Sequence, residues 1–213
     1  MKKNLTELVF ILDRSGSMAG LEGDTVGGFN GLISKQKKEE GECLVSVTLF
    51  DNVSELLYDR INLKSIRPMT DNDYSVCGCT ALLDAVGEEI KRVELIHKYI
   101  RDEDIPEHTV FVITTDGMEN ASRKYTLPQI KTMIEKKRAK GWQFLFLGAN
   151  IDAADTASSM GISEDCAADY HADGTGTAVM YEALSEAVCC VRGRGSVERE
   201  WKRSVEKDYK NRQ

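Results

Sequence analysis

Short apolar runs alternate along the chain with longer stretches of helical periodicity. Compact runs of β-forming residues predict strands over residues 5–12, 43–50, 55–63, 109–115, 142–147 and, more weakly, 166–171. Apolar positions three and four apart predict helices over residues 26–33, 80–101, 126–141, 153–160 and 175–191. Alternation of near-continuous apolar strands with helices is typical of an α/β fold, a mostly parallel sheet with helices on both faces.

One connection in this pattern is too short for a parallel crossover. Asp51-Asn52 separates the second and third strands, so these two are expected to form a hairpin whose outer strand is an antiparallel edge of the sheet. The alternating pattern ends near residue 191. We therefore expect one domain over residues 1–191 and a separate tail over residues 192–213.

Charge and cysteine content narrow the class of protein. The 28 Lys and Arg against 35 Asp and Glu give a net charge of −7, and an acidic domain repels nucleic-acid phosphate. The longest apolar runs, residues 8–12 and 110–113, are too short for a membrane span or a signal peptide. A cytoplasmic protein is expected, in which the six cysteines are most simply free thiols. A transition-metal site or a disulfide remains an alternative.

Oxygen-bearing side chains gather at positions where α/β sheets bind ligands. Asp13, Ser15 and Ser17 follow the first strand, Asp116 follows the fourth, and Thr80 opens the long helix between them. The carboxyl ends of parallel strands meet at one edge, and carboxylate and hydroxyl oxygens suit Mg²⁺, Ca²⁺ or Mn²⁺. Individually, each residue is also explained by helix capping or a turn, but the combined spacing is harder to explain that way.

The combined pattern resembles the metal-ion-dependent adhesion site of von Willebrand factor type A (vWA) domains. The matching motifs are Asp13-x-Ser15-x-Ser17, Gly78-x-Thr80-Ala81-Leu82 and Thr115-Asp116-Gly117, within a resemblance that covers about residues 5–191. It implies a three-layer, doubly wound, six-stranded sheet of strand order 3-2-1-4-5-6. It also implies that Ser15, Ser17 and Thr80 coordinate a metal directly, with Asp13 and Asp116 holding it directly or through water.

The family resemblance also implies a function. Members bind protein partners through an acidic residue that completes the metal's coordination shell, and the chain looks most like small, stand-alone intracellular members from bacteria and phages. We therefore expect a non-enzymatic module that uses Mg²⁺, or else Mn²⁺ or Ca²⁺. Its partner would be a protein presenting Asp or Glu, with no nucleic acid or membrane involved, and the chain would be a monomer. The expected contact rim is Met18, Asp73, Tyr74 and Glu119.

Two other functions use the same residues. A metal-assisted hydrolase of phosphoesters would use the cation as a Lewis acid, but no evident nucleophile or base accompanies it. Glu119 is the nearest candidate for a base, although a role in its turn explains it better. A metal-free scaffold is the third possibility, and the complete set of five expected ligands argues against it.

Two features depart from a plain domain of this kind. Cys79 stands where the family often has glycine, and with Cys77 it forms either a redox switch or a pair of tolerated thiols. In the tail, Val197, Trp201, Val205 and Tyr209 recur every four residues among basic residues, which predicts a basic amphipathic helix. That helix would pack on its own acidic body, dock on a partner protein, or contact a membrane or nucleic acid.

Overall fold

In the computed structural model, which describes residues 1–212, six strands form one sheet in the order β3-β2-β1-β4-β5-β6. The strands are β1 (Lys2–Asp13), β2 (Glu42–Phe50), β3 (Ser54–Asn62), β4 (Pro106–Thr115), β5 (Gln143–Gly148) and β6 (Ala167–Asp169). Only the pairing of β3 with β2 is antiparallel. The predicted order and the antiparallel edge strand are confirmed.

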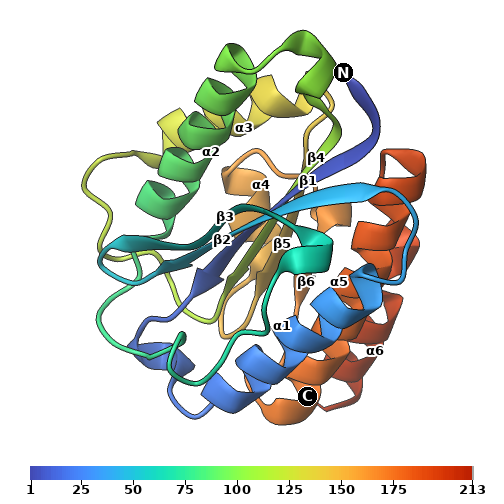
Figure 1. Ribbon diagram of the computed structural model, residues 1–213. Coiled ribbons are helices and arrows are strands. Elements are labelled where there is room, and N and C mark those ends of the chain that lie inside the picture. The colour runs from blue at the N-terminus through green and yellow to red at the C-terminus, as the bar shows by residue number, and fades with distance from the viewer. Residues whose placement is uncertain (213) are drawn as a thin grey trace.

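Helices cover both faces of this sheet (Figure 1). They are α1 (Glu22–Gln36), α2 (Leu82–Tyr99), α3 (Leu127–Arg138), α4 (Ala153–Ser159), α5 (Gly174–Arg194) and α6 (Arg203–Asn211). Helices α1, α5 and α6 pack on one face, and α2, α3 and α4 pack on the other. The result is the three-layer α/β arrangement that the sequence predicts.

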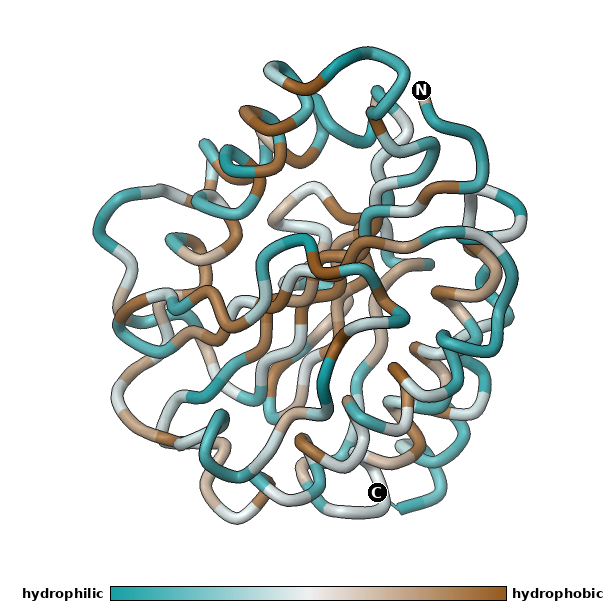
Figure 2. The backbone as a smooth tube through the Cα atoms, in the orientation of Figure 1, coloured by the Kyte–Doolittle hydropathy of each residue, from teal (hydrophilic) through white to brown (hydrophobic). Residues whose placement is uncertain are grey.

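The central strand β1 explains why its sequence is a continuous apolar run. Leu8, Phe10 and Leu12 belong to the core cluster on the α1 side, whereas Val9 and Ile11 belong to the cluster on the α2 side. All five are fully buried, because a central parallel strand has a helical layer on each face. The hydrophobic colouring of Figure 2 is accordingly concentrated along the strands at the centre. Within residues 1–212, no helix is long and apolar enough to cross a membrane.

The tail lies against the body of the domain. Helix α5 continues to Arg194 and ends at Gly195, whose left-handed φ of +78° is typical of a glycine C-cap, so the expected boundary at 191 falls inside a helix. A 3₁₀ turn (Arg199–Lys202) then precedes α6, in place of one helix from Val197 onward. Trp201 and Val205 are buried in the α1-side core. Of the three expected positions, the structure shows packing on the domain's own body.

The exposed edge strand β3 does not pair regularly with β2. Val45 pairs with Ile61 but Val47 pairs with Tyr58, so β3 carries an extra residue at this point. Arg60 lies in this bulge with a left-handed φ of +49°, and its guanidinium reaches the fully buried Glu7 on β1, with Nε 2.7 Å from Oε1. The bulge thus turns a basic side chain inward from the edge of the sheet.

Two neighbouring glycines of α1 allow a matched test of its packing on α5. A Cβ on Gly28 would lie 2.2 Å from Cδ2 of the buried Tyr181 ring, whereas a Cβ on Gly27 meets nothing within 4 Å. We expect Gly28→Ala to lower the free energy of unfolding by about 1–3 kcal/mol through overpacking. Gly27→Ala is expected to raise it by about 0.5–1 kcal/mol, since alanine is the better helix former. Urea unfolding of both variants measures the difference, and equal effects would contradict this packing.

Candidate metal centre

Three loops meet at the carboxyl edge of the sheet and are tied together through their backbones. The loop after β1 pairs with the loop before α2: Cys77 N donates to Arg14 O at 2.9 Å, and Gly16 N donates to Gly78 O at 3.1 Å. The loop after β4 joins them through Asn120 N, which donates to Thr80 O at 3.1 Å. The backbone therefore holds together the three segments that carry the predicted ligands.

Four of the five predicted ligands form a continuous chain of oxygens. Thr80 Oγ1 lies 3.1 Å from Ser15 Oγ, and Ser15 Oγ lies 3.1 Å from Ser17 Oγ. Ser17 Oγ then donates to Asp116 Oδ1 at 2.5 Å. Ser15, Thr80 and Asp116 are buried while Ser17 is exposed, so the chain opens to solvent at Ser17. The structure therefore brings these four side chains to one place.

The fifth predicted ligand, Asp13, lies behind this chain and uses both carboxylate oxygens inside the protein. Its Oδ1 accepts from Ser15 N at 2.7 Å, and its Oδ2 accepts from Thr115 Oγ1 at 2.5 Å. Thr115 was part of the sequence motif, but nothing in the motif assigned it this role. Asp13 is therefore placed to orient the Ser15 loop and to supply negative charge, with each of its carboxylate oxygens already accepting one hydrogen bond.

The two carboxylates make the centre electrostatically unbalanced. Burial raises the pKa of Asp13, even though hydrogen bonds from Ser15 and Thr115 oppose the rise. Burial also raises the pKa of Asp116, and the negative charge of Asp13 adds to that effect. Within residues 1–212, Asp116 Oδ2 is buried without any hydrogen-bond partner. A buried, unpartnered carboxylate oxygen beside a second carboxylate is costly, and a bound cation would relieve that cost.

The kind of cation follows from the donor set. Two carboxylates and three hydroxyls are hard oxygen donors, which fit a hard divalent cation better than a thiolate or imidazole site would. Within the described chain, no three His, Cys, Asp or Glu residues are grouped so as to hold a metal. This does not conflict with the oxygen chain, because three of its donors are Ser and Thr. The residues therefore fit the metal that the family resemblance implies.

Two residues of the expected contact rim are buried instead. Met18 ends a 3₁₀ turn (Gly16–Met18) that directs its side chain into the α1-side core, where it is 4% exposed. Tyr74 is 2% exposed, and its hydroxyl donates to the backbone oxygen of Asp13. The expectation that Met18 and Tyr74 contact a partner is therefore wrong for this conformation. Both side chains support the loop after β1 from the α1-side core.

The other two rim residues lie nearer the surface, but their carboxylates are engaged. Asp73 forms a bidentate pair with Arg67 at 2.7 Å, and this guanidinium holds the pKa of Asp73 well below its usual range. Glu119 accepts from Leu83 N, Ala121 N and Ser122 N. Glu119 thus fixes its own turn to the start of α2. Of the two roles considered for Glu119, a general base or a part of its turn, the hydrogen bonds fit the second.

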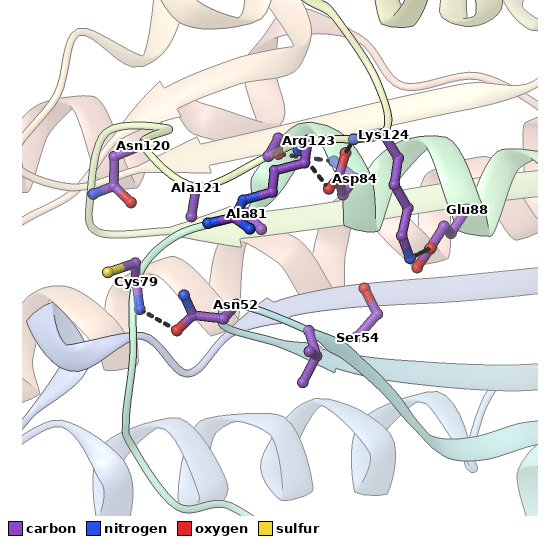
Figure 3. Close-up of a pocket in the computed structure, with 12 residues that line it drawn as sticks. Asn52, Ser54, Cys79, Ala81, Asp84, Glu88, Asn120, Ala121, Arg123 and Lys124 are labelled. Atoms are coloured by element: carbon purple, nitrogen blue, oxygen red, sulfur yellow. Dashed lines mark hydrogen bonds and ion pairs between the residues drawn. The ribbon is translucent and has the colours of Figure 1, made fainter.

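Sequence reasoning missed several exposed residues near the centre. Met118 and Val53 are 75% and 63% exposed, an unusual exposure for apolar side chains. Beside the centre is a pocket of about 590 Å³, lined among others by Cys79, Ala81 and Arg123 (Figure 3). The position of Met118 in the Gly-Met pair directly after Asp116 was a possible signal that its side chain is exposed beside the centre. No local pattern marked Arg123.

The two cysteines before Thr80 are exposed thiols. The Cys77 Sγ lies 3.4 Å from Asp51 Oδ2, and this carboxylate raises the pKa of the Cys77 thiol. A raised pKa lowers the fraction of reactive thiolate, which argues against Cys77 as a readily oxidised sensor. Between the two, Gly78 has a φ of +75°, and a Cβ there would lie 2.1 Å from Asn52 Oδ1, so this position requires glycine.

Comparison with known proteins identifies the fold. Neither a protein-family model nor a curated protein matches this sequence. Among solved structures, proximal thread matrix protein 1 from the mussel byssus, with a zinc-occupied MIDAS (metal-ion-dependent adhesion site) motif, matches with a TM-score of 0.60 and 14% identity. That match covers 86% of this chain and 46% of the mussel protein, so the chain spans about half of its length.

Two further structures have the same fold. The manganese-loaded TRAP protein of Plasmodium vivax matches with a TM-score of 0.56 and 16% identity, over 84% of this chain and 73% of that one. The vWF domain of the type V pili tip protein Mfa5 from Porphyromonas gingivalis matches with a TM-score of 0.62 and 9% identity, over 90% and 97% of the two chains. At these identities the likeness is one of fold, and this chain has the vWA fold.

Proposed function

We propose that this chain is a metal-dependent protein-binding module whose metal is completed by an acidic residue of the partner. The observation that carries the proposal is the buried Asp116 Oδ2, which has no hydrogen-bond partner among residues 1–212, while Oδ1 of the same carboxylate ends a chain of three hydroxyls. Such an arrangement is poorly compensated by the protein alone. It is suited to an ion that reaches the site from solvent.

Each ligand would have a distinct role. Ser15, Ser17, Thr80 and Asp116 would hold a divalent cation directly, and Asp13 would act from behind through the Ser15 loop. Mg²⁺ fits best because neutral hydroxyls leave room for the waters it retains, while Mn²⁺ and Ca²⁺ accept the same donors. When bound, the cation supplies an electropositive position for an oxygen anion. The zinc-occupied and manganese-loaded structures of the same fold support a divalent metal in general.

The proposed partner is a protein that presents Asp or Glu to this position. The exposed Met118, on the loop that carries Asp116, offers an apolar contact beside it. Net negative charge disfavours nucleic acid as the partner. The six free cysteines favour a reducing compartment, in keeping with a location in the cytoplasm.

A hydrolase built on the same metal is the less favoured function. Glu119 is the nearest candidate for a general base, but three backbone N–H groups already occupy its carboxylate. Turnover of a generic phosphoester with Mg²⁺ or Mn²⁺ that disappears in Asp13→Ala would reverse this ranking. In a metal-free scaffold, nothing would compensate the cost of burying the unpartnered Asp116 oxygen.

The proposal predicts that a simple carboxylate and the metal promote each other's binding. After chelation, we expect Mg²⁺ to raise the melting temperature, and acetate to lower the Mg²⁺ concentration needed, because binding linkage is reciprocal. Ser15→Ala should abolish both effects, while Ser54→Ala, a nearby serine outside the oxygen chain, should leave them intact. Thermal unfolding over Mg²⁺ and acetate titrations measures this. Acetate acting equally with a chelator present would contradict a metal-bound carboxylate.

A further inference from the structure

The pocket beside the metal centre shares a wall with it. Cys79 and Ala81, which line the pocket of about 590 Å³, flank the metal-site residue Thr80 in the chain. Asn120, another lining residue, accepts from Thr80 N through its Oδ1 at 3.0 Å. A ligand held at the centre would therefore lie close to this pocket, whose lining residues Cys79, Ala81 and Asn120 are drawn in Figure 3.

The carboxylates that line the pocket are already paired. Asp84 is 9% exposed and accepts from the backbone N–H groups of Arg123, Lys124 and Tyr125 at 2.8–2.9 Å. Glu88 is paired with Lys124 Nζ. These contacts fix the loop that follows the metal site to α2. They also leave the pocket with no carboxylate available for another cation.

Among the cationic groups that line the pocket, the guanidinium of Arg123 is the one outside an ion pair, whereas Asp84 is held by neutral backbone N–H groups. Arg123 is exposed, and within residues 1–212 its side chain takes part in no ion pair, in contrast to the neighbouring Lys124. Figure 3 shows this guanidinium near Ala81, among the residues that line the pocket. The pocket lies at the N-terminal end of α2, whose first backbone N–H groups are already bound by Glu119 and by Ser122 Oγ. Arg123 is therefore the cationic group of this pocket that is available to pair with an anion from outside.

We propose that this pocket binds a second carboxylate of the same partner, so that the partner is recognised by an acidic segment carrying two carboxylates. This inference rests on the proposed function, since the first carboxylate is the one at the metal. A guanidinium presents parallel N–H donors that match a carboxylate in a bidentate pair, which a lysine does not. Arg123 is thus a specificity-determining residue for the spacing of acidic side chains in the partner.

Both carboxylates should come from one segment of the partner chain, because each contact is weak when it is made alone. An exposed ion pair contributes little by itself. Once the first carboxylate is at the metal, the second is presented to Arg123 at a high effective concentration, and the two contacts strengthen each other. A separate small anion lacks that advantage. The arrangement therefore selects paired acidic residues over isolated ones.

Short peptides test this inference directly. We would measure fluorescence anisotropy with capped, labelled peptides that carry one aspartate, or two aspartates separated by one, two or three glycines, in Mg²⁺ and after chelation. At least one two-aspartate peptide is expected to bind wild type about tenfold more tightly than the one-aspartate peptide, as one charge-assisted pair would provide. Arg123→Gln should remove that advantage, so that the one-aspartate and two-aspartate peptides bind the variant with the same affinity.

Two further variants serve as controls. Lys124→Gln, which removes a charge already paired with Glu88, should keep the advantage, and Arg123→Lys should keep part of it. An equal advantage in wild type and Arg123→Gln, or none in wild type, would overturn the inference and leave the proposed function intact. An Arg123-dependent advantage that persists after chelation would also overturn it, since the pocket would then act without the metal. If no peptide binds in Mg²⁺, the proposed function falls as well.

Discussion

Replacing Asp116 by asparagine is expected to abolish metal-induced stabilisation and, with a chelator present, to make the protein more stable than wild type. Asp116 provides the one unpartnered carboxylate oxygen of the centre, so the variant loses a ligand. At a metal concentration of about 100 times Kd, wild type should gain about 2.7 kcal/mol, which the variant lacks. Without metal, asparagine removes a buried negative charge that lies close to Asp13, so the variant should unfold at a higher temperature than wild type.

The metal-free gain is expected to depend on pH in a defined direction. Burial and the charge of Asp13 raise the pKa of Asp116, so the folded protein binds this proton more tightly than the unfolded chain does. The wild-type protein without metal therefore gains stability as the pH falls through that raised pKa, and loses it as the pH rises. The advantage of Asp116→Asn should be full at neutral pH and should vanish in acid.

Thermal unfolding with chelator and with Mg²⁺, at neutral and acidic pH, measures both effects. Asp73→Asn is the matched control, because Asp73 pairs with Arg67 and lies outside the oxygen chain. It should retain the full response to metal. A metal response that survives in Asp116→Asn would show that the ion binds elsewhere.

Trp201→Ala is expected to lower the free energy of unfolding by about 3–5 kcal/mol, the usual range for removing a buried large aromatic side chain. The Trp201 ring is 4% exposed within the α1-side core, and its Nε1 donates to Asp165 O at 2.9 Å. The adjacent Lys202 donates through Nζ to Glu164 O and Ala167 O at 2.7 and 2.8 Å. The tail is thus bound to the segment that contains β6 by core packing and by hydrogen bonds.

A second aromatic residue of the tail provides the comparison. Tyr209 is half-buried and stacks on His171 with ring centroids 4.7 Å apart. Tyr209→Ala should therefore cost about 1 kcal/mol, since it removes one aromatic contact at the surface. Urea unfolding of both variants measures the difference. Equal and small losses would mean that the tail leaves the body in solution and is available to a partner.

The sheet and the oxygen chain were predictable because their residues carry local signals. A strand covered on both faces must be apolar throughout, as residues 5–12 are, and the capping box of Thr126 and Gln129 marks the start of α3. The predicted ligands Ser15 and Ser17 stand at fixed spacing after a strand end. Parallel strands bring such ends together whatever the intervening sequence.

The surroundings of the centre were not predictable in this way. Met18 and Tyr74 lie in irregular loops, where no periodicity states which side of the chain faces the core. Arg123 is placed by the carboxylate of Asp84, which lies 39 residues earlier and binds its backbone N–H. Likewise, the four-residue spacing from Val197 indicated which tail residues are buried but not the 3₁₀ turn that precedes α6. Such positions depend on long-range contacts.

The bulge at Arg60 bears on how this chain avoids aggregation. An edge strand with exposed apolar side chains, as β3 has at Leu56 and Ile61, is a template on which another molecule can extend the sheet. Such extension needs an unbroken row of backbone donors and acceptors, and the left-handed residue interrupts that row near the C-terminal end of the strand. The inward ion pair with Glu7 holds the interruption in place. A contact inside the domain therefore opposes polymerisation of the protein through its own sheet edge.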